Sequence, residues 1–161
     1  MKPTGIYTVL LVLVTTCFCV DGQDLSLKLM KAQSLKNSGR YSEALEFLGN
    51  AIRNSVDSRL YVLKGETEIK AGLLDEAVKD FSEASNLTPG SGDLGLARVY
   101  SMKNMPARSV AFLESHMSSD QKQPEKSILL DESFSAIENS PEWRGFWKRE
   151  HYNGLERAIS E

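Results

Sequence analysis

The sequence predicts an all-α fold in which antiparallel helix pairs stack on one another as a short α-solenoid. Along most of the chain after residue 23, apolar residues recur at spacings of three and four, which is typical of amphipathic helices. A set of small and apolar residues also recurs 33 positions later: Gly39, Ala44, Leu48 and Ala51 return as Gly72, Ala77, Phe81 and Ala84. A repeat of this length indicates stacked supersecondary units rather than one closed core.

The overall composition is typical of a single globular domain without a strongly charged face. The chain has 161 residues, enough for one domain, and 41% of them are hydrophobic, which is ordinary for a globular protein. Acidic and basic residues are mixed along the chain, and the net charge is −3. Without a basic stripe, nucleic-acid binding is disfavoured, and so is attachment to a membrane through a strongly charged face.

Residues 1–22 are typical of a secretory signal peptide, with a basic start, an apolar middle and small residues near the end. Val20 and Gly22 suit a cleavage site, so we expect the mature chain to begin at Gln23 and to be exported to the periplasm or the cell envelope. Two alternatives are an uncleaved membrane anchor and a lipid-modified N-terminus at Cys17 or Cys19. Because both cysteines lie in this segment, the mature chain would have no thiol for a disulfide, a nucleophile or a metal.

Residues 23–57 form the first predicted copy of the repeat. Its first helix spans 24–37 and is followed by Gly39, which suits the left-handed conformation just after a helix end. Its second helix runs from Tyr41 to Ile52, and a turn over 54–58 leads to the next copy.

Residues 58–90 form the second copy, whose helices are separated by Gly72. Pro89 ends the second helix, because proline cannot continue one. Two helices joined by so short a turn lie antiparallel. Small residues stand where paired helices must approach closely. The corresponding pairs in the two copies are Ala32 and Gly65, Ala44 and Ala77, and Ala51 and Ala84.

The second copy resembles a tetratricopeptide repeat in residues 61–65, 71–77, 80–84 and 87–89. The first copy matches less fully, since Lys28 stands at the early aromatic position and no proline closes the unit. A third, degenerate copy is expected over 91–118, with Asn104 in place of the turn glycine and Pro106 in the first turn of the next helix. Ser109 and His116 replace the expected alanines. The family implies a right-handed superhelix.

Residues 119–161 are predicted to form a polar loop and a C-terminal helical cap or tail. We expect a short helix over 128–137 and then a helix with Ser140 as N-cap and Pro141 as its first residue. Trp143, Phe146 and Trp147 would cover the end of the stack; the alternative is an exposed aromatic platform for a partner. The segment resembles a tail that follows tetratricopeptide units in exported proteins of Bacteroidetes-type bacteria, which suggests part of a longer architecture or a truncated product.

Three patterns that could indicate chemistry have simpler interpretations. Residues 90–95 match the dinucleotide fingerprint, but no strand precedes them, so we interpret them as a turn with Asp93 as N-cap. His116 and His151 are isolated and belong to no metal-ligand spacing. The acidic residues of the helix over 74–87, which include Asp80, are expected on a hydrated outer face. We therefore expect no enzymatic activity, no metal and no cofactor.

The family resemblance implies a scaffold that binds a peptide segment or partner protein in a concave groove. The first helix of each copy would line it. The implied residues are Leu29, Gln33 and Lys36 in copy one, Arg59, Val62, Glu66, Ile69 and Lys70 in copy two, and Leu94, Arg98 and Ser101 in copy three. This mixed set suits a peptide with apolar anchors and both signs of charge. The alternative is a structural or assembly module that self-associates or packs on further repeats, without a free groove.

Overall fold

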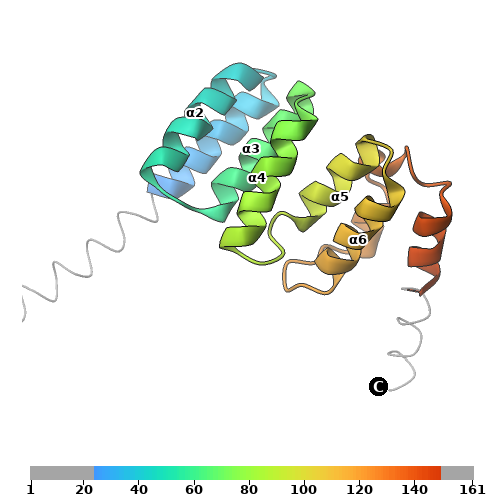
Figure 1. The fold of residues 1–161 in the computed structure, drawn as a ribbon. Coiled ribbons are helices and arrows are strands. Elements are labelled where there is room, and N and C mark those ends of the chain that lie inside the picture. Colours follow the sequence, from blue (N-terminus) through green and yellow to red (C-terminus); the bar gives the residue numbers. More distant parts are fainter. Residues whose placement is uncertain (1–23, 150–161) are drawn as a thin grey trace, which may run out of the picture.

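The computed structural model describes residues 24–149, and these residues form helices and no β-strand (Figure 1). Residues 24–37 form the first helix and residues 141–149 the last. Between them lie α2 (Tyr41–Asn54), α3 (Ser58–Ala71), α4 (Leu74–Leu87), α5 (Asp93–Met102), α6 (Pro106–Met117), α7 (Glu125–Leu129) and the 3-10 helix η1 (Glu132–Phe134). The predicted all-α fold is confirmed.

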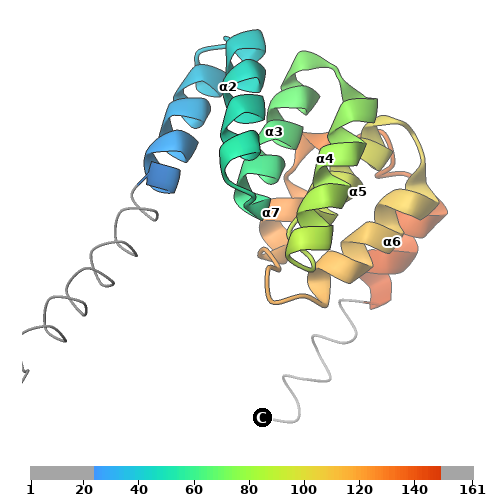
Figure 2. The same ribbon diagram turned by 60° about the vertical axis from the view of Figure 1, so that its left-hand side comes forward.

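Consecutive helices pack against each other in a row, as expected of a short solenoid. α3 contacts both α2 and α4, and α5 contacts both α4 and α6. Figures 1 and 2 show the same order from two directions, with each helix beside the one before it. In the described part of the chain, we find no helix with the length and apolar character that a membrane crossing requires.

Left-handed residues make the tight turns within each pair. Gly39 and Gly72 have φ values of 72° and 79°, and Asn104 replaces glycine in the third copy with a φ of 54°. Glycine and asparagine tolerate this conformation best. Pro106 begins α6, where its missing N–H removes no helical hydrogen bond. These sequence predictions are confirmed.

Phe81 of α4 packs into a space that two glycines leave open. The ring is 1% exposed. A Cβ added at Gly65 of α3 would lie 2.8 Å from the ring, and one added at Gly95 of α5 would lie 2.3 Å from it. Both distances are shorter than packed carbon atoms tolerate. The two glycines therefore let α3 and α5 approach the same aromatic ring, which joins the second and third copies.

The third copy packs although it lacks the expected alanines. Ser109 and His116 are 0% and 3% exposed. The Ser109 hydroxyl donates to the carbonyl of Ala97 at 2.7 Å, and Nε2 of His116 accepts the Gln123 N–H at 3.0 Å. Each polar replacement thus gains one partner, which offsets the cost of burying Ser109 and part of the cost of burying His116, whose Nδ1 has none.

The aromatic residues near the C-terminus are buried, as predicted for a cap. Trp143 and Phe146 share a core cluster with Leu113 of α6, and Trp147 packs partly against it. Trp143 stacks on Phe134 with ring centres 5.0 Å apart. The expected N-cap is also present, because the Trp143 N–H donates to the Ser140 hydroxyl at 3.2 Å. These residues cover the end of the row of helices.

Two local predictions were wrong. The N-cap of α5 is Gly92, and Asp93 is the first helical residue. The buried Asp93 carboxylate accepts instead from the hydroxyls of Ser85 and Ser115. The helix expected over 128–137 is broken after Leu129, where Asp131 accepts the Ser133 N–H at 3.0 Å and starts η1. Such side-chain contacts compete with helical hydrogen bonds. The predictions for residues 1–22 and for His151 onward lie outside the described residues.

Gly95→Ala tests the packing around Phe81. The added methyl overlaps a buried ring that cannot swing away, so we expect the free energy of unfolding to fall by about 1–3 kcal/mol. Gly49→Ala in α2 is the matched control, since its added Cβ meets nothing within 4 Å. There the change should stabilise the helix by about 0.5–1 kcal/mol. Urea denaturation followed by circular dichroism measures both, and equal effects would contradict this account.

Candidate functional site

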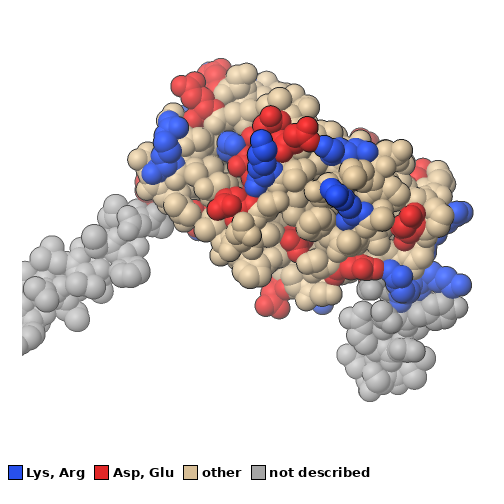
Figure 3. Space-filling view, viewed as in Figure 1, with Lys and Arg blue, Asp and Glu red and all other residues tan. Residues whose placement is uncertain are grey.

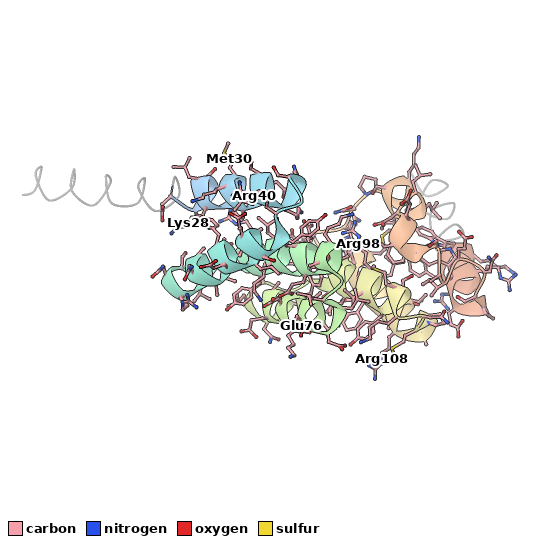
Figure 4. All side chains as sticks on the ribbon, turned by 90° about the horizontal axis from the view of Figure 1, so that it is seen from above. Lys28, Met30, Arg40, Glu76, Arg98 and Arg108 are labelled. Carbon is pink, nitrogen blue, oxygen red and sulfur yellow. The ribbon has the colours of Figure 1, made fainter. Side chains whose placement is uncertain are left out.

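Five of the residues predicted to line a groove meet in one hollow. Lys36 of the first helix, three residues of α3 and Arg98 of α5 enclose about 230 Å³. The α3 residues are Glu66, Ile69 and Lys70, and the tail adds Asp131 and Ser133. In Figure 4, Arg98 lies on the side of the tail, whereas Glu76 and Arg108 lie on the opposite side. The first helices of the copies therefore share one face, which we call the concave face.

Two further hollows extend this face in both directions. Leu29 and Gln33 line a shallow hollow of about 670 Å³ with Leu63 and the outer residues of the first helix. Ile69 and Lys70 also border a hollow of about 780 Å³ beside Met102, Leu130 and the segment 131–136. The concave face is thus open from the first helix to the tail.

Four of the predicted residues lie elsewhere. Arg59 is exposed and pairs with Asp57, with Nε and Oδ1 2.9 Å apart. Val62 packs partly buried against the cluster around Phe81. Leu94 is 5% exposed and Ser101 is fully buried. Burial removes the last two from any surface that a partner can reach.

The tail of the chain fills the concave face of the third copy. Leu94 and Ala97 of α5 pack in one cluster with Ile128, Phe134 and Ile137. Figures 1 and 2 show the segment between α7 and the last helix running behind α5, whereas the last helix lies beside α6. Burial of Leu94 is a direct result, because a residue expected to face a partner faces the chain itself.

An ion pair fixes this tail to α5. Nε of Arg98 donates to Oδ2 of Asp131 at 2.6 Å, and both side chains are largely buried. Burial opposes the charge of Asp131, but the Ser133 N–H and Arg98 outweigh it and lower the pKa of the carboxyl. Asp131 and Ser133 were missed by sequence reasoning, since nothing in their local pattern indicates contact with α5.

The hollow of 230 Å³ has one cation in excess. Lys36 pairs with Glu66, and Arg98 pairs with Asp131. Among residues 24–149, no carboxylate lies within ion-pair distance of Lys70, which is exposed at the rim. On the face shown in Figure 3, by contrast, basic and acidic side chains alternate and neither sign gathers. The arrangement favours an acidic group near Lys70.

A second charged cluster lies between α3 and α4. Glu68 is 3% exposed, and its Oε1 accepts from Lys64 at 2.8 Å. Lys64 also pairs with Asp80, which corrects the prediction of a fully hydrated Asp80. Oε2 of Glu68 is buried without a partner. Burial and the nearby Asp80 raise the pKa of Glu68 to about 7 against the opposing effect of Lys64. Copy one has Leu35 at the matching position.

Glu68→Leu tests this cluster by restoring the residue of copy one. The folded chain binds the Glu68 proton more tightly than the unfolded chain does, so its stabilising effect is complete below pH 4.5 and is lost as the pH rises through about 7. Leucine does not ionise, so the variant does not lose stability in this way as the pH rises. We expect the stability of the variant relative to wild type to increase by about 2–3 kcal/mol across this range. Glu83→Leu on the exposed side of α4 should show no comparable trend in urea denaturation at each pH.

Asp131→Asn tests the attachment of the tail. The substitution removes the charge that pairs with half-buried Arg98 and should weaken this contact by about 1–2 kcal/mol. Amide hydrogen exchange in residues 125–137 should then be roughly tenfold faster. Asp120→Asn, in an exposed turn, is the control. Unchanged exchange in the first variant would show that the apolar contacts alone hold the tail.

The chain was compared with known proteins. No family model matches it, and no curated protein matches it either. Within residues 24–149, no group of three or more His, Cys, Asp and Glu side chains is placed to hold a metal ion.

Proposed function

We propose that this chain is an exported tetratricopeptide-type scaffold that binds a peptide segment of another protein on its concave face. The observation that carries the proposal is the hollow shared by Lys36, Glu66, Ile69, Lys70 and Arg98, which come from three different helices. A site assembled from successive repeats is how such stacks hold extended partners.

The chemistry of the hollow favours a peptide with an acidic group beside an apolar side chain. Ile69 offers apolar contact, and Met102 and Leu130 extend it in the adjoining hollow of about 780 Å³. Lys70 supplies the cation in excess. A peptide carboxylate beside Lys70 and an apolar anchor over Ile69 would satisfy both features. Because the tail occupies copy three, the concave face formed by residues 24–149 is open in two copies, and we expect modest affinity.

Export and family membership are part of the same proposal. Residues 1–22 support secretion to the periplasm or cell envelope through their signal-like pattern. The recurrence of small residues at the helix contacts supports the tetratricopeptide assignment. An exported scaffold of this kind would meet its partner outside the cytoplasm.

Peptide selection on the purified chain tests the binding site. A display library of random peptides should yield binders that combine acidic and apolar residues. Lys70→Glu places a negative charge where we expect the peptide carboxylate, and should weaken the selected peptides by about tenfold or more. Ile69→Ser should weaken them by removing the apolar contact.

Lys79→Glu on α4 is the matched control, because it makes the same charge change on an exposed helix away from the hollow. Fluorescence anisotropy with a labelled selected peptide measures all variants. If a selected peptide binds the Lys70→Glu variant and the wild type with equal affinity, the binding site is not at Lys70.

A further inference from the structure

The outward side of the first helix carries two large apolar side chains, although the ends of repeat stacks usually present a polar face. Leu27 and Met30 are 65% and 66% exposed. Together with exposed Ser34 they lie on the side of the helix that faces away from its own core. We call Leu27, Met30 and Ser34 the N-terminal strip. Figure 4 shows Met30 projecting outward at the edge of the molecule.

The repeat indicates what such a strip packs against. The residues 33 positions later are Leu60, Leu63 and Thr67, which are 0%, 6% and 0% exposed. Leu60 and Leu63 share a core cluster with residues of α2, in the preceding copy. The N-terminal strip therefore has the register of a helix-packing face, but no described helix covers it.

The opposite end of the row is closed. Ser109, Leu113 and His116 of α6 occupy the positions that Ala77, Phe81 and Ala84 hold in α4, and they are 0%, 0% and 3% exposed. The tail covers this surface, because Leu113 packs with Trp143 and Phe146. Head-to-tail stacking, in which the first helix of one chain packs on α6 of another, is thereby blocked.

We propose that two copies of this chain associate through their N-terminal strips, with the two first helices antiparallel about a two-fold axis. A two-fold contact needs only one self-complementary patch, and the N-terminal strip is the end face that residues 24–149 leave uncovered. An axis near Met30 places Leu27 of one chain opposite Ser34 of the other, a large side chain against a small one. Nζ of Lys31 lies 4.5 Å from the centre of the Phe47 ring in α2 of the same chain. This cation–π interaction holds the Lys31 charge away from the contact between the two first helices.

Light scattering tests the association. The chain is purified from its own host, so that its N-terminus is the one that the host's processing produces. Between about 1 µM and 1 mM, the mass should rise from one chain toward two. Leu27→Glu buries an unpaired charge in the contact and should keep the chain a monomer over the same range. Val56→Glu is the matched control, because Val56 is 68% exposed but lies in the loop before α3. Circular dichroism confirms that each variant is folded.

Crosslinking tests the symmetry independently. In a chain with Cys17→Ser and Cys19→Ser, Met30→Cys should be joined to itself by a short bismaleimide, whereas Val56→Cys should not. A monomer at every concentration, a dimer that survives Leu27→Glu, or a ladder of larger oligomers would each overturn the proposal. Leu27→Glu should leave peptide binding near Lys70 unchanged, so failure here is distinguishable from failure of the proposed function.

Discussion

The contact between Phe81 and two glycines is the constraint on which the rest of the structure depends. Gly65 and Gly95 leave room for one aromatic ring between α3, α4 and α5. The ring thereby fixes the distance between the helix that carries Glu66, Ile69 and Lys70 and the helix that carries Arg98. A larger residue at either glycine would separate the walls of the hollow. The geometry of the hollow therefore depends on the packing of Phe81 against the other side of α3 and α5.

Burial in the third copy shows how a repeat tolerates polar substitutions. Ser109 and His116 stand at alanine positions, yet both are buried and hydrogen-bonded. Burial is only partly satisfied at His116 and at Glu68, because Nδ1 of His116 and Oε2 of Glu68 are buried without a partner; burial lowers the pKa of His116 and raises that of Glu68. Ser109 is accommodated by a local partner, whereas His116 and Glu68 each leave a cost that depends on pH.

Much of the fold could be predicted because its signals are local. Helix spans, the left-handed turns at Gly39, Gly72 and Asn104, and the small residues at helix contacts follow from spacing and backbone sterics. Five of the residues implied by the family resemblance line one hollow, and their role in binding stays a prediction. The path of the tail could not be predicted in this way. The Arg98–Asp131 contact joins residues that are far apart in the sequence, and the same tail buries Leu94.

The covalent link between the tail and the third copy makes the tail a strong competitor of any free ligand for that copy. Only residues 118–124 separate α6 from α7, so the tail is always near α5, at an effective concentration that short linkers place around the millimolar range. A competing peptide dissolved at micromolar levels cannot displace it without much tighter intrinsic binding. Weakly binding ligands therefore cannot occupy the third copy even when they are abundant. Partner binding is expected at the first and second copies, which the tail does not cover.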